Sequence, residues 1–362
     1  MNHHSSRREF LQVTALAAGA LALPSFSISR RRNQEKIGVA LVGLGYYSTQ
    51  VLAPALQLTE HCRLAGIVTG TPAKAERWKE QYGIPEKNIY NYETFDEIAD
   101  NPDIDVIYIV LPPSMHAEYS IRAAQAGKHV WCEKPMALTV KECQSMIDAA
   151  DKAGVKLSIG YRMHHEPNTQ RIMQIAEEKP FGPIRLVTAS AGYYDGRSDH
   201  WKQKKEMGGG AMYDMGVYPL NAARYTTGEE PISVMAQHFT NRPEIYTEVD
   251  ETTLFQLEFP SAAAAQCATS FGMSMNFLKV IYAEGRAELE PFSAYSGVKG
   301  ATSGDITLDA TLDNQQARQM DDDALAIINN QPVLVPGEVG LRDIRVVEAV
   351  YKSARTGKKV TL

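Results

Sequence analysis

A lysine, an aspartate and a tyrosine are the residues of this chain best suited to proton transfer. Lys134 stands in the run HVWCEKPMA, residues 129–137, directly after an apolar stretch. A buried ammonium without a partner is costly, so this lysine needs a counter-charge or a chemical role. Asp214 and Tyr218 are four residues apart, and on a helix both side chains would share one face.

This trio predicts general-base chemistry on a hydroxyl group. Tyrosine, with an ordinary pKa of about 10, is a poor base near neutral pH, but a neighbouring ammonium stabilises the phenolate. Lys134 is the candidate for that ammonium, Tyr218 for the base and Asp214 for the group that holds a neighbouring hydroxyl. On the residues alone, the alternative is that Tyr218 is a core aromatic and Asp214 a helix cap.

A glycine-rich turn follows the first predicted strand. Residues 37–42 form an apolar, β-branched run typical of a strand that is buried on both faces. The next residues are Gly43-Leu44-Gly45-Tyr46-Tyr47-Ser48, followed by a helical pattern. Two glycines let a backbone approach a pyrophosphate, which the N-terminus of the next helix attracts. The turn therefore predicts a dinucleotide site, although the third glycine position holds Ser48 and a plain strand–turn–helix would share the pattern.

Strands and helices alternate along the first half of the chain. Strand patterns lie at 63–68, 106–111, 129–132 and 156–160, and helical patterns between them include 116–126 and 140–153. This alternation is typical of an α/β fold with a doubly wound parallel sheet, which binds ligands at the carboxyl ends of its strands. The second half predicts further strands at 185–194, 232–239, 252–259 and 278–283, and a last helix at 341–355.

The second predicted strand indicates which nucleotide is bound. In NAD sites an acidic residue at the end of this strand holds the ribose 2′-hydroxyl, and it would repel a 2′-phosphate. The stretch RLAGIVTGTPAKAER has no acid before Glu76 but offers Thr69, Lys74 and Arg77. We therefore expect NADP, with NAD as the alternative if these cations are only a solvated helix face.

The N-terminus predicts export. The pattern Ser6-Arg7-Arg8-x-Phe10-Leu11 precedes a short apolar run and resembles a twin-arginine signal. The apolar run is too short for a stable membrane anchor. Residues 1–30 are therefore assigned to a signal and linker, and the mature protein to the periplasm or another extracytoplasmic location. An ordinary secretory signal with two chance arginines is the alternative.

Composition and charge exclude other classes of protein. The net charge of −6 argues against a nucleic-acid partner, which would require a basic face. The four cysteines show neither paired metal spacing nor a disulfide framework. Neighbouring His164 and His165 point apart and no third ligand is spaced for zinc, so no metal site is predicted.

Several motifs in one order resemble the glucose-fructose oxidoreductase / inositol dehydrogenase / MocA (Gfo/Idh/MocA) family. They are the glycine turn, the Glu133-Lys134-Pro135 run and GGGAMYDMGVY at 208–218. The similarity is closest to the glucose-fructose oxidoreductase branch, through LPPSMHAE at 111–118 and GYRMH at 160–164. It implies a Rossmann domain at 31–157 and a C-terminal α/β domain at 158–362, with a large open, mostly antiparallel sheet.

The resemblance also implies which residues line the cofactor. They are Gly43, Leu44, Gly45, Tyr46, Tyr47, Thr69, Lys74, Tyr92, Leu111, Pro112, His116, Glu133, Lys134, Arg162, Trp201 and Lys202. Close relatives have Trp-Arg where this chain has Trp201-Lys202, so a forked donor is replaced by a single ammonium.

The implied activity is sugar oxidation. Lys134, Asp214 and Tyr218 would be catalytic, and hydride would pass between a pyranose-type sugar and a tightly bound NADP that a second sugar or carbonyl substrate regenerates. A redox-neutral glycosidase or epimerase and an ordinary dehydrogenase with dissociable NADP are the alternatives. A homo-oligomer, dimer or tetramer, is expected, because the C-terminal sheet of the family often forms the subunit interface.

Overall fold

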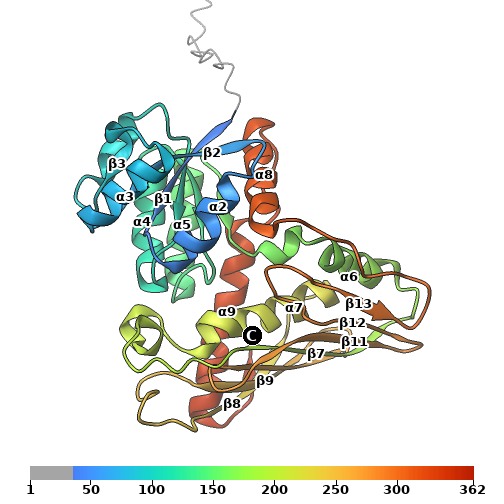
Figure 1. Cartoon of the computed structure of the whole chain (residues 1–362). Helices are drawn as coiled ribbons and strands as arrows, with labels where there is room; N and C mark the ends of the chain where they lie inside the picture. The colour runs from blue at the N-terminus through green and yellow to red at the C-terminus, as the bar shows by residue number, and fades with distance from the viewer. Residues whose placement is uncertain (1–35) are drawn as a thin grey trace, which may run out of the picture. The chain divides into compact units, whose positions relative to one another are not determined.

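The computed structural model describes residues 36–362 (Figure 1), and the predicted signal lies outside the described residues. A six-stranded parallel sheet occupies the first half, in the order β3-β2-β1-β4-β5-β6. Its strands are β1 (Ile37–Val42), β2 (Cys62–Val68), β3 (Ile89–Tyr90), β4 (Val106–Ile109), β5 (His129–Cys132) and β6 (Leu157–Ile159). This strand order is that of a Rossmann fold, whose ligand crevice opens where the order reverses, between β1 and β4. The predicted doubly wound sheet is confirmed.

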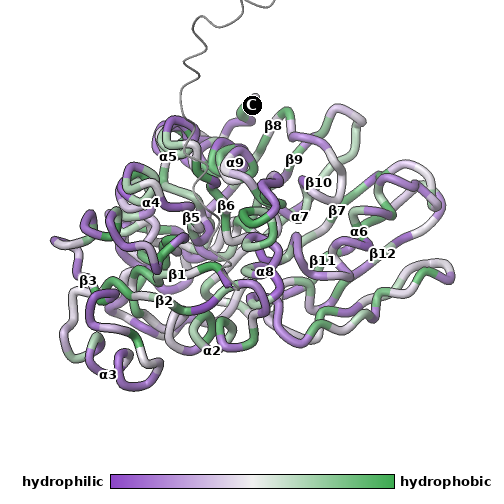
Figure 2. The backbone as a smooth tube through the Cα atoms, turned by 90° about the horizontal axis from the view of Figure 1, so that it is seen from above, coloured by the Kyte–Doolittle hydropathy of each residue, from purple (hydrophilic) through white to green (hydrophobic). Residues whose placement is uncertain are grey.

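Helices connect the parallel strands. They are the π-helical turn Ser48–Leu52 with α2 (Ala53–Leu56), α3 (Pro72–Tyr82), α4 (His116–Gln125) and α5 (Val140–Ala153), with short 3₁₀ turns at Glu86–Asn88, Phe95–Asp100 and Pro113–Met115. The predicted helix 140–153 has these bounds because Thr139 and Glu142 form a capping box at its start and Gly154 ends it at φ 68°. In Figure 2, β1 is green along most of its length and α3 is mostly purple, as buried strands and a peripheral helix require.

An eight-stranded sheet forms most of the second half, in the order β13-β12-β11-β7-β10-β9-β8-β14. Its strands are β7 (Ile184–Gly192), β8 (Ser233–Phe239), β9 (Thr252–Glu258), β10 (Ala264–Ser270), β11 (Met275–Tyr282), β12 (Arg286–Leu289), β13 (Gly300–Thr302) and β14 (Val360–Thr361). The β7–β10 pair is parallel and the other pairs are antiparallel. The predicted open, mostly antiparallel sheet is confirmed.

The remaining helices flank the two sheets. They are α6 (Pro167–Glu178), α7 (Val217–Thr227), α8 (Gln315–Ile328) and α9 (Gly337–Thr356), with short turns at Arg162–His165, Trp201–Gln203 and Lys205–Met207 and a π-helical turn at Met212–Gly216. The α7 helix packs on β7, and α9 contacts α5, β6 and β8 (Figure 1). No helix within residues 36–362 is long and apolar enough to cross a membrane.

The C-terminal chain returns to the first sheet. Ile159 of β6 donates its backbone N–H to the carbonyl of Val335, and α8 packs against α2 and β2. Residues near the end of the chain therefore complete the packing of the first sheet.

Candidate active site

The glycine turn after β1 has the shape that a pyrophosphate requires. Gly43 has φ +88°, and a Cβ there would lie 2.6 Å from the carbonyl oxygen of Val110, so only glycine fits. A Cβ on Gly45 would meet nothing within 4 Å, which leaves open space over the turn. Ser48, at the third glycine position, donates its hydroxyl to the Gly43 carbonyl at 2.5 Å and so closes the turn. Helical backbone begins at Tyr46, with the free N–H groups of a first turn, and the turn therefore fits the diphosphate of a dinucleotide.

Residues predicted to hold the adenosine end lie together beside this turn. Lys74, in the first turn of α3, donates its ammonium to the carbonyl of Leu44 at 3.0 Å. Thr69 is buried at the end of β2, and a Cβ on the next residue, Gly70, would lie 3.1 Å from the ring of Tyr92. Thr69, Lys74 and Tyr92 thus converge on one rim of the site, while Arg77 is exposed farther along α3.

The floor of the site joins the ends of β4 and β5. His116 is buried with its two ring nitrogens 2.8 Å from the carbonyl oxygens of Leu111 and Pro135, so it ties the Glu133-Lys134-Pro135 segment to the end of β4. Burial lowers the pKa of His116. Tyr108 donates its hydroxyl to Glu133 at 2.7 Å, and burial raises the pKa of that carboxyl. Pro112, also predicted to line the cofactor, is half-buried beside Leu111.

The three catalytic candidates converge from both halves of the chain. The ammonium of Lys134 lies 5.0 Å from the centroid of the Tyr218 ring, donates to the backbone carbonyl of Asp214 at 2.8 Å and lies 3.5 Å from Asp214 Oδ1. Burial disfavours this ammonium, but the nearby groups, Tyr218 and Asp214 first, hold the pKa of Lys134 above its ordinary value. The pair is a buried cation over a tyrosine ring, and a cation near a tyrosine favours its phenolate form.

Asp214 has further donors on its other oxygen. Lys202 donates to Oδ2 at 2.6 Å and Tyr193 donates to the same atom at 3.2 Å. Burial works against the charge, but Lys202 and Lys134 hold the pKa of Asp214 well below its usual range. The carboxylate is therefore an acceptor fixed in its ionised form, and it is not a base. The sequence predicts a cofactor contact for Lys202, and in the structure its ammonium also binds Asp214, one of the catalytic candidates.

The run of glycines before Asp214 is required by close packing. A Cβ on Gly209 would collide with the backbone carbonyl of Lys202, and one on Gly210, at φ +109°, would collide with the carboxylate of Asp250. Met212–Gly216 then forms a π-helical turn before α7 begins at Val217. Asp214 thus lies on a widened turn, a feature common at functional sites, and Tyr218 lies in the first turn of α7, so the two are not on one regular α-helix as the four-residue spacing predicts.

Arg162 supplies a second cation beside Tyr218. Its side chain is 2% exposed, and its guanidinium lies 5.5 Å from the ring centroid of Tyr218 and 4.8 Å from that of Tyr295. Its partners are the carbonyls of Ser293 and Ala294, the side-chain oxygen of Gln315 and the sulfur of Met163. No salt bridge to Arg162 is present within residues 36–362, so a buried positive charge faces the site without its own carboxylate.

Three other predicted contacts lie at the rim. Tyr46 is 75% exposed, so its contribution to the glycine turn is its backbone. Tyr47 is half-buried, with its ring centroid 6.0 Å from that of Tyr295, and Trp201 is half-buried with its ring 5.6 Å from the Lys202 ammonium. Sequence reasoning missed Tyr193, Tyr108 and Gln315, since each acts through a contact between segments distant in the chain.

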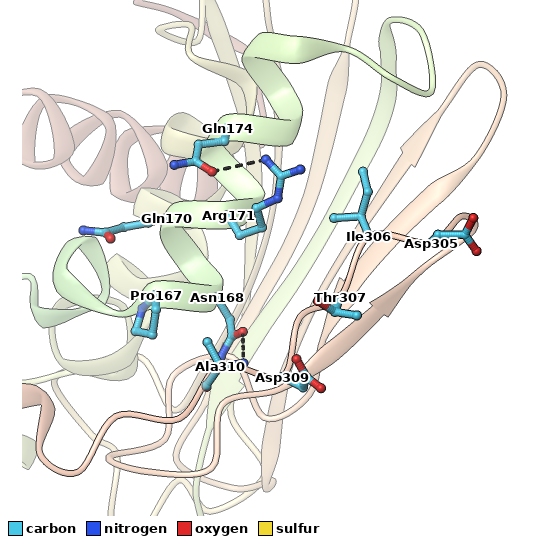
Figure 3. Close-up of a pocket in the computed structure, with 10 residues that line it drawn as sticks. All are labelled: Pro167, Asn168, Gln170, Arg171, Gln174, Asp305, Ile306, Thr307, Asp309 and Ala310. Atoms are coloured by element: carbon cyan, nitrogen blue, oxygen red, sulfur yellow. Dashed lines mark hydrogen bonds between the residues drawn. The ribbon is translucent and has the colours of Figure 1, made fainter.

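A separate cavity of about 510 Å³ lies between α6 and the segment 305–310 (Figure 3). Its walls are the exposed faces of Gln170, Arg171, Asp305 and Asp309, and Asn168 at its base is bonded to Ala310 in both directions. The residues that line this cavity include none of the catalytic candidates. His164 and His165 are likewise engaged elsewhere, with Asn221 and Asp322.

Comparisons with known proteins agree with this geometry. Residues 37–161 match the model of an oxidoreductase family with an NAD-binding Rossmann fold, residues 169–288 match a GFO/IDH/MocA C-terminal domain, and residues 303–362 match the C-terminal alpha/beta domain of the oxidoreductase family.

Among solved structures, the chain is similar to an aldose-aldose oxidoreductase from Caulobacter crescentus complexed with glycerol. The identity is 41%, the TM-score is 0.87, and the match covers 90% of this chain and 100% of that one. A D-xylose 1-dehydrogenase [NADP(+)] from Haloarcula marismortui is 29% identical over 89% of this chain and 92% of its own length. A scyllo-inositol dehydrogenase from Lactobacillus casei, solved with NAD(H) and scyllo-inositol, shares the fold at 20% identity and a TM-score of 0.75, over 90% of this chain and 99% of that one. The chain belongs to the GFO/IDH/MocA oxidoreductase family, with an NAD(P)-binding Rossmann domain.

Proposed function

We propose that this protein is an exported sugar oxidoreductase that transfers hydride between a pyranose-type sugar and a tightly bound NADP, which a second sugar or carbonyl substrate regenerates. The observation that carries the proposal is the convergence of Lys134, Asp214 and Tyr218 beside the dinucleotide turn. The similarity to an aldose-aldose oxidoreductase and to a xylose dehydrogenase supports sugars as the substrate class.

The chain's own residues divide the work of alcohol oxidation. When bound, the nicotinamide supplies the hydride acceptor for oxidation and the donor for the reverse step. The phenolate of Tyr218 takes the proton of the anomeric hydroxyl, and the ammonium of Lys134 stabilises that phenolate beforehand. Asp214 Oδ1 accepts a hydrogen bond from a neighbouring sugar hydroxyl, since Oδ2 is occupied by Lys202 and Tyr193. Loss of the proton and of a hydride from the anomeric carbon leaves a lactone.

NADP is the expected nucleotide. Thr69 and Lys74 stand where an NAD-specific site would carry an acid, and an ammonium with a hydroxyl suits a 2′-phosphate. Gly43 to Tyr47 would hold the pyrophosphate and Tyr92 would lie beside the adenosine. Binding of the refolded apoprotein to both nucleotides tests this, with a lower Kd for NADP expected and equal values contradicting it.

Export is proposed from the twin-arginine pattern at Arg7 and Arg8. A free nicotinamide cofactor is not expected outside the cytoplasm, so an exported enzyme would fold around its cofactor first and regenerate it in place. Replacing both arginines by lysine should leave the protein in the cytoplasmic fraction of an expressing cell. Unchanged export would instead indicate an ordinary secretory signal.

A homo-oligomer is proposed through the outer face of the eight-stranded sheet. Met235, Phe239 and Leu254 are exposed apolar side chains on the paired strands β8 and β9, and Leu254 stands opposite Gln237, between the other two. An apolar patch of this kind on a sheet is typical of an interaction surface. Light scattering on the purified protein should give the mass of a dimer or tetramer, and Leu254→Lys should lower it.

The activity is tested by adding a panel of aldoses to the mature protein purified without added nucleotide. Nicotinamide reduction, followed by absorbance and fluorescence, should show a stoichiometric burst that a second sugar or ketone reverses. Activity that requires added NADP would indicate a dehydrogenase with a dissociable cofactor. Cleavage or inversion of the sugar without net reduction would indicate a redox-neutral enzyme.

The roles of the residues are tested by variants in the same assay. Tyr218→Phe and Lys134→Ala should each lower the burst rate by about 100-fold or more, because the general base or its stabilising charge is lost. Tyr225→Phe, on the same helix but outside the cluster, is the matched control. Wild-type turnover in both variants would refute the assignment.

A further inference from the structure

The active-site cluster holds two ammonium groups for one carboxylate. Lys134 and Lys202 are 12% and 19% exposed, and Asp214 between them is 12% exposed. Desolvated charges interact strongly, so the way in which these three are paired decides how much positive charge is left for other groups. We propose that Lys202 is the counter-ion of Asp214 and thereby leaves the charge of Lys134 to the phenolate of Tyr218.

The distances assign the pairing. Lys202 lies 2.6 Å from Asp214 Oδ2, the length of a strong charge-assisted hydrogen bond. Lys134 lies 3.5 Å from Oδ1, and its short contact of 2.8 Å is with the backbone carbonyl of Asp214, which carries no net charge. The ammonium also lies over the ring of Tyr218, 5.0 Å from its centroid, and Glu133 and Tyr295 act on its charge as well. Without Lys202, Lys134 would be the sole cation paired with the Asp214 carboxylate, and the pair would be neutral.

Lys202 is built into the segment that carries Asp214. Its backbone carbonyl accepts the N–H of Gly210, and its ammonium binds the side chain of Asp214, so the last glycine of the run and the carboxylate that follows it are held by one residue. Tyr193, at the end of β7, completes a triangle by accepting from Lys202 at 2.9 Å and donating to Asp214 Oδ2. Lys202 acts through Asp214 and Lys134 and is a positioning residue for the proton transfer.

The other charges around the cluster balance one another. Asp195 and Arg197 form a bidentate ion pair, and His200 has its pKa lowered by burial and by the neighbouring Arg197 and Lys202. Burial raises the pKa of the Glu133 carboxyl, and the charges of Lys134 and, more weakly, of Arg162 oppose that rise. With Glu133 ionised, the site has one positive charge in excess, and a phenolate at Tyr218 neutralises it.

This inference rests on the proposed roles of Lys134 and Tyr218, and its test separates charge from hydrogen bonding. Lys202→Met and Tyr193→Phe each remove one donor from Asp214 Oδ2, but only the first removes a charge. The assay is kcat/KM for sugar oxidation as a function of pH in the holoenzyme, with thermal unfolding as the check on folding.

Lys202→Met should move the rising limb of the pH profile upward by about one unit, so that the rate near neutral pH falls about tenfold more than the plateau rate. Lys202→Arg should restore the wild-type midpoint, and Tyr193→Phe should keep it even where its plateau rate is lower. An unchanged midpoint in Lys202→Met, or an equal shift in Tyr193→Phe, would overturn the inference.

A second readout does not depend on turnover. The ultraviolet absorbance of tyrosinate, taken as the difference between a parent protein and its Tyr218→Phe derivative across pH, reports ionisation of Tyr218 directly. The Lys202→Met parent should ionise at higher pH than the wild type, and coincident curves would refute the proposal. If no sugar reduces the cofactor but the curves shift, the proposed function fails while the charge pairing stands.

Discussion

Asp323 is a buried carboxyl whose replacement should make the protein more stable at neutral pH. It lies on α8 with 0% exposure, and its Oδ2 accepts the hydroxyl of Ser158 on β6 at 2.9 Å. Its Oδ1 has no partner among the described residues. Burial raises the pKa of Asp323 to about 6, and the nearby His165 and the Ser158 hydroxyl only partly offset that rise.

The sign and size of the effect follow from the two protonation states. In the unfolded chain this carboxyl titrates near 3.8, so between that value and about 6 the folded protein holds a proton that the unfolded chain has lost. Folding stability is therefore greatest below the lower value and falls as pH rises through the higher one. A difference of about two units corresponds to about 3 kcal/mol of the free energy of unfolding.

Asp323→Asn keeps the shape and the acceptor for Ser158 and removes the titration. Urea unfolding of both proteins at about pH 4 and about pH 8 should show the variant gaining up to about 3 kcal/mol on the wild type between the two conditions. Asp309 is an exposed acid on the loop before α8, and Asp309→Asn controls for the change in net charge. This control should gain little free energy of unfolding on the wild type between the two pH values. An equal difference between Asp323→Asn and wild type at both pH values would refute the reasoning.

Two further substitutions test the turns and the rim of the cofactor site. Gly210→Ala should lower the free energy of unfolding by about 3 kcal/mol or more, because φ is +109° and the new methyl meets the Asp250 carboxylate. Its control is Gly228→Ala, at φ +66° with nothing within 4 Å, which should cost only about 1 kcal/mol in the same urea titration. Lys74→Ala should raise the Kd of the apoprotein for NADP about tenfold or more and change its Kd for NAD little. Arg77→Ala is the control. Equal losses of affinity for both nucleotides in Lys74→Ala would count against a 2′-phosphate contact.

The first sheet could be predicted because its signals are local. The apolar run before Gly43 makes β1, and Thr139 with Glu142 and Gly154 marks both ends of α5. By contrast, β10 was absent from the prediction, since AAQCATS has four small residues and little β-branched character; its pairing with β7 and β9 decides its structure. The last helix begins at Gly337, earlier than the predicted 341, because its first residues pack against β6 and α5.

The residues of the candidate site could be predicted from the sequence, but the contacts between them could be predicted less well. Lys134, Asp214 and Tyr218 are identified by type and by the family motif, and the structure brings them together. The pairing of Lys202 with Asp214 depends on how the turn at 201–203 folds over the glycine run, and no spacing in the sequence encodes that. Pair contacts between distant segments are set by the tertiary packing and not by local pattern.

Helix α8, in the second half of the chain, contacts residues that line the predicted nucleotide site in the first half. Its buried face carries polar side chains beside apolar ones. Gln315 binds Arg162, Gln319 donates to Tyr108 at 3.4 Å, and Asp323 accepts from Ser158. Most buried polar groups are hydrogen-bonded, so these pairings favour one position of α8 against the first sheet. Arg162, which Gln315 binds, faces Tyr218, and Tyr108, which Gln319 contacts, donates to Glu133. The position of α8 therefore fixes the charged groups on both sides of Lys134.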